Sequence, residues 1–132
     1  MSQHVLQRLF FEATYLVVKY GSVWVDNPRC RFVRIERFPL PRGCNARFCA
    51  LVLEIPVGYP QVPPPRFYIP DWVRCASGRM LEHTFQADGD WREWLWGSLH
   101  CKTWRPTTSP LRGHSLLSYC NGIEAHMPRW NR

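Results

Sequence analysis

Residues 48–72 read FCALVLEIPVGYPQVPPPRFYIPDW, and they determine the fold class that the sequence predicts. The apolar segment Ala46–Glu54 leads into this stretch and is typical of a buried β-strand. Prolines follow at positions 56, 60, 63, 64 and 65. Because each lacks an amide hydrogen and has a fixed φ angle, they end the strand and keep the chain extended. A short aromatic strand is then expected at Arg66–Ile69.

The proline-rich segment has two interpretations besides a packed crossing. Such a segment serves as a stiff connector in many β proteins, and proline-rich chains also bind aromatic grooves on other proteins. Free ligand segments are usually polar, whereas this one lies between two apolar strands and contains Tyr59. A crossing that packs within its own domain is therefore favoured.

Upstream, the sequence predicts one helix and two strands. Ser2 is a residue type that caps helices, and apolar residues recur at helical spacing from there to Tyr20-Gly21. The strands are expected at Ser22–Asp26 and Arg31–Phe38, which together with Ala46–Glu54 would form an antiparallel meander. The expected apolar face of the helix consists of Val5, Leu6, Leu9, Phe10, Ala13, Leu16 and Val17.

Downstream, the pattern is less regular. Val73–Gly89 is expected to be largely loop, and Asp90–Trp104 contains four of the seven tryptophans. A final helix is expected to begin at Ser109-Pro110, because serine caps helices and proline suits the first helical position. Asn121-Gly122 is expected to break this helix early and residues 128–132 to fray. Its expected apolar face consists of Leu111, Leu116, Leu117, Cys120, Ile123 and Met127.

Length and composition indicate a single domain. The chain has 132 residues, of which 45% are hydrophobic, and no linker or repeat divides it, so residues 1–132 are expected to form one domain with a core over about 3–125. No apolar stretch approaches the roughly 20 residues that cross a membrane, and the N-terminus lacks a signal-peptide pattern. We therefore expect a soluble, cytoplasmic protein that does not bind membranes.

The net charge of +7 is carried almost entirely by arginine. Lys19 and Lys102 are the only lysines among seventeen basic residues, so fifteen are arginines. Arginine suits carboxylates and phosphates, but here the arginines are scattered among acidic and aromatic residues. A basic nucleic-acid-binding tail is therefore not indicated, and an acidic protein partner accounts for the charge equally well.

Six cysteines occur without paired spacing, at positions 30, 44, 49, 75, 101 and 120. No C-x-x-C motif is present, and no Cys/His pair follows Cys44 and Cys49, so neither a metal nor another cofactor is expected. Disulfides are not expected in the absence of a secretion signal. Cys49 lies in an apolar strand and Cys120 on the inner face of a helix, which indicates core positions.

The order of these elements resembles the ubiquitin-conjugating (UBC-like) fold, an α+β fold with an N-terminal helix, an antiparallel β-meander, a proline-rich crossing and a C-terminal helix. Residues 56–65 are similar to its "P-x-x-Y-P-x-x-P-P" crossing. The closest resemblance is to the prokaryotic ubiquitin-conjugating-like proteins of family E. That family also carries a Trp-rich segment before a "W-x-P" step, where this chain has Trp91-Arg92-Glu93-Trp94 and Trp104-Arg105-Pro106.

The resemblance implies acyl-transfer chemistry in which a cysteine accepts the C-terminal glycine of a ubiquitin-like modifier from an activating enzyme. Ubiquitin-conjugating enzymes place this cysteine in a "G-x-x-C" step, and the run from Gly97 to Cys101, followed by Trp104, is similar with one extra residue. Cys101 is therefore the candidate nucleophile. His100 and Lys102 flank it and are expected to lower its pKa, and His100 or Ser98 is a candidate for proton transfer.

Three features leave other assignments open. The His-Pro-Asn triplet of ubiquitin-conjugating enzymes, whose Asn stabilises the oxyanion, is replaced by Tyr68-Ile69-Pro70-Asp71. Cys75 is the second candidate nucleophile, and Cys101 is also compatible with an ordinary buried thiol. His83 and His114 are further candidates for a base or donor.

Two functions of different kinds therefore remain besides a conjugating enzyme of a bacterial pathway. One is a catalytically inactive adaptor of the same fold that binds a ubiquitin-like protein or its activating enzyme. The other, less favoured, is nucleic-acid binding through arginine and tryptophan. The sequence does not identify the modifier or the target protein.

Overall fold

A computed structural model describes residues 3–131 as two helices and a six-stranded antiparallel sheet. The strands lie in the order β1-β2-β3-β4-β6-β5, so the first four form a meander and β6 lies between β4 and β5. The helices are α1 (Gln3–Tyr20) and α2 (Leu116–Trp130), and a short 3-10 helix, η1, spans Gly89–Trp91. The strands are β1 (Val23–Val25), β2 (Phe32–Pro39), β3 (Phe48–Glu54), β4 (Phe67–Pro70), β5 (Thr84–Gln86) and β6 (Trp94–Gly97). The predicted α+β, UBC-like class is confirmed.

Two rows of paired residues show how the sheet separates core from surface. The inner row faces α2, where the ring of Phe67 stacks on that of Trp130 with centroids 6.1 Å apart. It runs across all six strands through Val25, Val33, Leu53, Phe67, Gly97 and Thr84. The outer row consists of Trp24, Arg34, Val52, Tyr68, Trp96 and Phe85. Because side chains alternate along a strand, this register places the inner row in the core beneath the helices and the outer row on the opposite face of the sheet.

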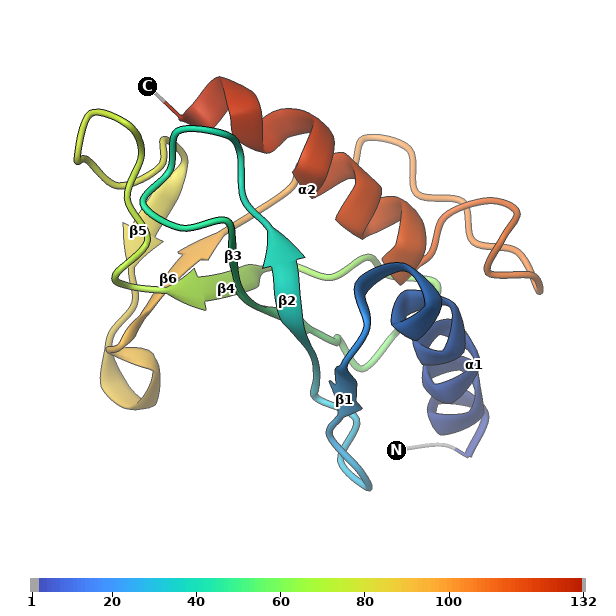
Figure 1. Ribbon diagram of the computed structural model, residues 1–132. Coiled ribbons are helices and arrows are strands. Elements are labelled where there is room, and N and C mark those ends of the chain that lie inside the picture. Colours follow the sequence, from blue (N-terminus) through green and yellow to red (C-terminus); the bar gives the residue numbers. More distant parts are fainter. Residues whose placement is uncertain (1–2, 132) are drawn as a thin grey trace.

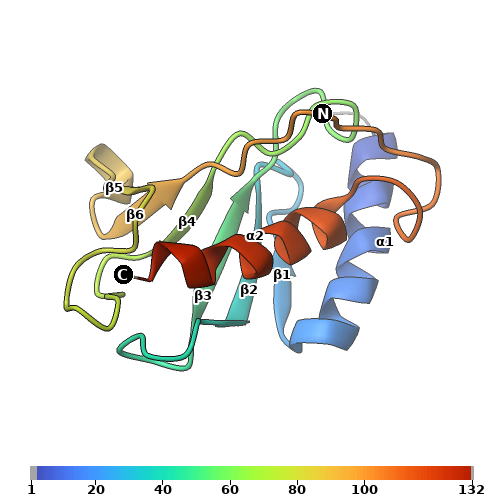
Figure 2. The ribbon, with the colours of Figure 1, turned by 90° about the horizontal axis from the view of Figure 1, so that it is seen from above.

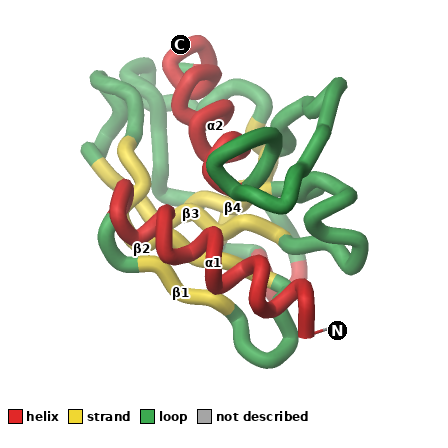
Figure 3. The backbone as a smooth tube through the Cα atoms, turned by 90° about the vertical axis from the view of Figure 1, so that its right-hand side faces the viewer, coloured by secondary structure: helices red, strands yellow, loops and turns green. Residues whose placement is uncertain are grey.

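The two helices cover the inner side of the sheet. α2 crosses the strands, and α1 lies beside β1 with its middle close to the start of α2 (Figures 1, 2 and 3). In α1 the side chains of Leu9, Ala13 and Leu16 are buried as predicted, but Phe10 and Val17 are about half exposed. The predicted cap, Ser2, lies outside the described residues.

The strand predictions for the first half of the chain are confirmed, and Val33 and Ile35 point inward. Those for the second half missed two strands: β5 lies in the segment expected to be loop, and β6 pairs with β4. The sequence of β6, WLWG, contains no polar residue. Its outer-face residues are Trp94 and Trp96, which lie near other aromatic rings and arginines. It therefore lacks the alternation that identifies a half-exposed strand.

The predicted start of the last helix was wrong. Ser109 and Pro110 form a turn that ends in Gly113, whose φ of +77° is incompatible with a right-handed helix. The helix begins instead after Ser115, whose side chain accepts hydrogen bonds from the backbone of Leu117 and Ser118 in a capping box. Leu111 consequently lies outside the helix and is exposed.

The predicted break at Asn121-Gly122 was also wrong, as was the frayed tail over residues 128–131, whereas Arg132 lies outside the described residues. α2 continues to Trp130 even though Pro128 lies inside it. Leu99 packs against the helix at Gly122, where a Cβ atom would lie only 2.6 Å from the Leu99 Cδ2 atom. Trp130 is buried against Phe67, and this packing fixes the end of the helix.

Candidate functional site

The proline-rich crossing supports the segment that contains Cys101. The Ser98 hydroxyl donates a hydrogen bond to the Pro65 carbonyl (3.0 Å), and the Trp104 Nε1 atom donates to the Pro60 carbonyl (2.7 Å). These two bonds lie on either side of Cys101 in the sequence. The crossing thus positions the candidate site, which explains why both features occur in one fold.

A buried carboxylate connects the crossing to both helices. Glu12 is fully buried on α1, and its oxygens accept hydrogen bonds from the Tyr59 hydroxyl (2.6 and 2.8 Å), the Arg8 Nε atom (2.6 Å) and the Leu116 backbone N–H (2.6 Å). A charged residue is retained in a core only when it is paired in this way. Burial, followed by the Glu12 charge, raises the pKa of Tyr59, so its hydroxyl stays a donor.

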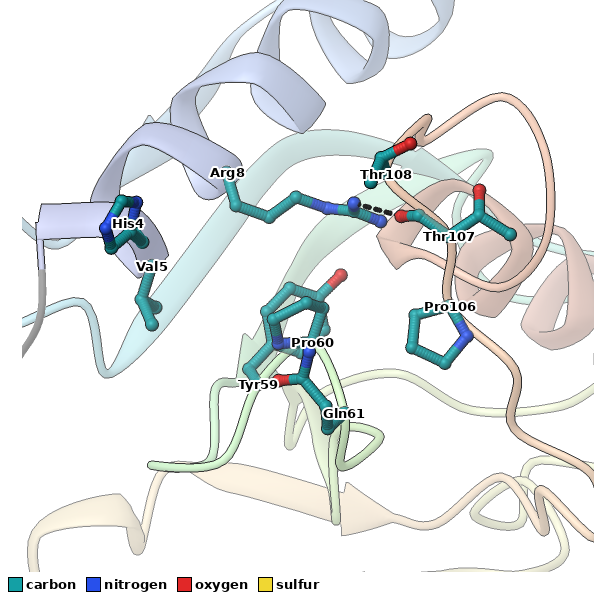
Figure 4. A pocket seen from close by; sticks show the side chains of 9 residues that line it. All are labelled: His4, Val5, Arg8, Tyr59, Pro60, Gln61, Pro106, Thr107 and Thr108. Carbon is teal, nitrogen blue, oxygen red and sulfur yellow. Dashed lines mark hydrogen bonds between the residues drawn. The ribbon is translucent and has the colours of Figure 1, made fainter.

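A cleft of about 520 Å³ opens beside this network, between α1, the crossing and residues 106–108. Figure 4 shows Arg8 reaching across it to the Thr107 carbonyl, with the Tyr59 ring below. The Arg8 Nη1 atom donates this bond at 2.5 Å. Since Arg8 is already paired with Glu12, the contact serves to attach the chain after Cys101 to α1.

Cys101 lies in a separate cavity of about 220 Å³ between its own loop and α2. Its thiol is partly buried and lies 3.5 Å from the Leu99 carbonyl oxygen, to which it donates a weak hydrogen bond. The lining residues are Leu99, His100, Cys101, Lys102, Thr103, Trp104, His114, Ser118, Tyr119 and His126. The structure therefore places both predicted site residues, Cys101 and His100, in one cavity.

The exposure of the other cysteines argues against most of them as nucleophiles. Cys30, Cys49 and Cys120 are buried in the core. Cys75, the second candidate, is also buried, and its thiol donates to the carbonyls of Arg79 (3.0 Å) and Met80 (3.3 Å). Cys44 is partly exposed, but the groove it lines is formed by residues 40–47 and includes no histidine.

The electrostatic prediction for Cys101 was wrong. Burial raises the pKa of its thiol, and no neighbouring charge counteracts this effect. Although His100 and Lys102 flank Cys101 in the sequence, neither lowers the pKa of its thiol. The thiol is consequently protonated at neutral pH, and its reaction requires a base.

Three histidines line the cavity, and they differ in exposure and in hydrogen bonding. His114 accepts a hydrogen bond from the Arg105 backbone N–H at its Nδ1 atom (2.8 Å) and stacks on Trp104, which assigns the proton to its Nε2 atom. The N–H donor of the His114 ring is therefore at Nε2. His100 and His126 are exposed, and His126 was not anticipated from the sequence because it lies on the last helix. His83 does not line this cavity and contacts Trp130 instead.

Tyr119 is the buried hydroxyl of the cavity. Its oxygen accepts a long hydrogen bond (3.4 Å) from the Leu99 backbone N–H, and only 1% of the residue is exposed. Burial raises its pKa most strongly, and the nearby Cys101 raises it further, so the phenol stays protonated. Tyr119 was not anticipated from the sequence, since the loop that it contacts is distant in sequence.

The tetrapeptide in place of the His-Pro-Asn triplet lies away from Cys101. In β4, Phe67 pairs with Gly97 at the end near the Cys101 segment, whereas Pro70 pairs with Trp94 at the other end. Asp71 follows Pro70, about 13 Å from Phe67 at roughly 3.3 Å per residue. Asp71 therefore cannot replace the oxyanion-stabilising asparagine.

The described residues include neither a metal-binding cluster nor a membrane-spanning helix. Between residues 3 and 131, no group of three or more His, Cys, Asp or Glu side chains is arranged to hold a metal ion. Neither helix in that part of the chain is long and apolar enough to cross a membrane.

Comparison with known protein families agrees with the fold. The family model described as prokaryotic E2 family E matches residues 15–120, which is most of the chain and includes Cys101, His114 and Tyr119. The chain belongs to prokaryotic E2 family E. Comparisons with curated proteins and with solved structures gave no significant match. Membership in an E2-like family implies interaction with a ubiquitin-like modifier and an activating enzyme.

Proposed function

We propose that this family E protein is a conjugating enzyme of a bacterial, cytoplasmic pathway that carries a ubiquitin-like modifier as a thioester on Cys101. The observation that carries the proposal is the Cys101 cavity, where a partly exposed thiol lies with His100 against α2 in a member of an E2-like family. The activating enzyme and a target protein would be its other partners. No cofactor or metal takes part.

The first step is an exchange of thioesters. The Cys101 sulfur attacks the carbonyl carbon of the modifier's C-terminal glycine, which is bound as a thioester to the activating enzyme. A new S–C bond forms, the old S–C bond breaks, and the thiol of the activating enzyme leaves with the proton that Cys101 gives up. Because burial keeps the thiol protonated, we assign His100 as the base that receives this proton during the attack.

The second step transfers the modifier to an amine of the target. The amine nitrogen attacks the Cys101 thioester, an amide bond forms, and the Cys101 sulfur leaves and takes up a proton. His100 is exposed at the rim of the cavity, where an incoming amine would approach. It can therefore relay the proton from the amine to the departing sulfur.

The alternative is an adaptor of the same fold that binds a ubiquitin-like protein or its activating enzyme without forming a thioester. The raised pKa of Cys101 and the position of Asp71 favour this alternative. The two functions differ in one observable property, the covalent adduct.

Intact-mass analysis without reductant tests the proposal. The protein is mixed with ATP, a ubiquitin-like modifier and the activating enzyme of that modifier, and Cys101→Ala is compared with the matched control Cys44→Ala. We expect a thiol-sensitive adduct on the parent protein and on Cys44→Ala, and none on Cys101→Ala. An adduct that persists on Cys101→Ala would place the site elsewhere. If the activating enzyme is charged but no variant forms an adduct, the protein is the adaptor and not a conjugating enzyme.

A further inference from the structure

The cavity contains a hydroxyl whose proton has no acceptor among the described residues. The Tyr119 oxygen accepts a hydrogen bond from Leu99, but its own O–H donates to no protein group between residues 3 and 131. The residue is almost fully buried, and it lines the same cavity as Cys101. A buried donor without a protein acceptor is costly, so an acceptor that a ligand brings into the cavity would stabilise it.

Leu99 forms hydrogen bonds with both this hydroxyl and the Cys101 thiol. The backbone N–H of Leu99 donates to the Tyr119 oxygen, while the carbonyl oxygen of Leu99 accepts from the Cys101 sulfur. The Leu99 side chain is in turn packed against α2 at Gly122, where a Cβ atom would lie 2.6 Å from the Leu99 Cδ2 atom. The thiol and the phenol are therefore hydrogen-bonded to the carbonyl and to the N–H of the same residue.

The reaction at Cys101 creates the acceptor that the phenol lacks. When sulfur or an amine attacks a thioester, the carbonyl oxygen becomes negatively charged, and a fixed donor that meets this oxygen lowers the barrier. Asp71 lies at the other end of β4 and is not a donor to this site. Tyr119 remains protonated in the cavity and is suited to the task.

We propose that Tyr119 is the oxyanion donor of this protein, and that it binds the carbonyl oxygen of the modifier's terminal glycine during attack at Cys101. The inference rests on the proposed function. Tyr119 donates a hydrogen bond and keeps its proton: the oxyanion forms as the new bond to carbon is made, and it collapses to the carbonyl as the leaving sulfur departs. The carbonyl oxygen of a glycyl thioester is thus the ligand group that this cavity recognises.

A peptide thioester allows the inference to be tested without the natural modifier. A short peptide that ends in Gly-Gly and is activated as a 2-mercaptoethanesulfonate thioester is mixed with the full-length protein, and acyl transfer to Cys101 is followed by intact mass. The same thiol is alkylated with iodoacetamide in parallel. Alkylation replaces iodide at a saturated carbon and forms no oxyanion, so it reports the access and reactivity of Cys101 alone.

Tyr119→Phe keeps the ring and removes the hydroxyl. We expect acyl transfer to fall by about 10²–10³-fold, as for the loss of one oxyanion donor, while iodoacetamide alkylation stays within about threefold. Tyr20→Phe is the matched control, because its hydroxyl also forms a hydrogen bond with a residue distant in sequence, Glu124, but Tyr20 does not line the cavity. This variant should leave both rates unchanged.

The other outcomes contradict the inference in distinguishable ways. If Tyr119→Phe transfers the acyl group as fast as the parent protein, Tyr119 is not the donor and the proposed function stands. If both rates fall together, Tyr119 only shapes the loop, and the donor assignment is wrong. If the parent protein is alkylated at Cys101 but takes no acyl group, the proposed function fails and the inference fails with it.

Discussion

Replacing Tyr59 with phenylalanine should destabilise the protein by a predictable amount. The hydroxyl donates to both oxygens of the buried Glu12 carboxylate at 2.6 and 2.8 Å and accepts the Leu116 N–H at 3.1 Å. A hydrogen bond to a charged group contributes about 1.5–3 kcal/mol. Glu12 retains Arg8 and the Leu116 N–H as partners, so the cost should remain below the roughly 3–5 kcal/mol of an unpaired buried charge.

The free energy of unfolding can be measured by urea titration with tryptophan fluorescence. We expect Tyr59→Phe to lower it by about 1.5–3 kcal/mol, with Tm falling by about 5–15 °C for a domain of this size. Tyr15→Phe is the matched control: Tyr15 lies on α1 and contacts Phe11, and its hydroxyl has no hydrogen-bond partner in the described part of the chain. The control should change stability by less than about 0.5 kcal/mol. Equal effects of the two variants would refute the role assigned to the buried network.

Three further predictions concern the frame around the site. Ser115→Ala removes the cap of α2 and should lower the free energy of unfolding by about 1–2 kcal/mol in the same titration, since Ser115 Oγ also donates to the Pro110 carbonyl; an unchanged midpoint would argue against the cap. Gly97→Ala should cost about 1–3 kcal/mol, because the new Cβ would lie 2.5 Å from the Phe67 ring; a neutral result would show that the ring moves freely. Burial raises the pKa of Cys49 to about 12, while the thiol in the unfolded chain ionises near pH 8.5. The contribution of Cys49 to stability is therefore fully present below about pH 8.5 and is lost as the pH rises toward 12. Between about pH 9 and 11, the free energy of unfolding of Cys49→Ala should therefore fall by about 1.4 kcal/mol less per pH unit than that of the parent protein. Equal slopes of unfolding free energy against pH in the two proteins would contradict this burial effect.

The sequence predicted the proline crossing well because its signals are local. Prolines restrict their own backbone, and the strands on either side are apolar. The start of α2 could not be predicted in this way. Ser109-Pro110 has the residue types of a helix start, but the helix begins after Ser115 because of the turn at Gly113, which also forms a bridge to Pro106.

The candidate site was predictable only in part. Cys101 and His100 follow from their order relative to Gly97 and Trp104, which is a sequence property. Tyr119 and Glu12 do not, because a tyrosine on a helix indicates core packing and a glutamate indicates a solvated position. Their roles depend on partners tens of residues away, such as Leu99 and Tyr59.

The most direct test of the central claim is to locate the modifier on the chain. After charging with the activating enzyme and ATP, the adduct is digested at mildly acidic pH without reductant and sequenced by tandem mass spectrometry. The account predicts the C-terminal glycine of the modifier on the sulfur of Cys101, in a linkage that hydroxylamine cleaves. A linkage to any other cysteine, or a charged activating enzyme that never transfers the modifier to this protein, would contradict it.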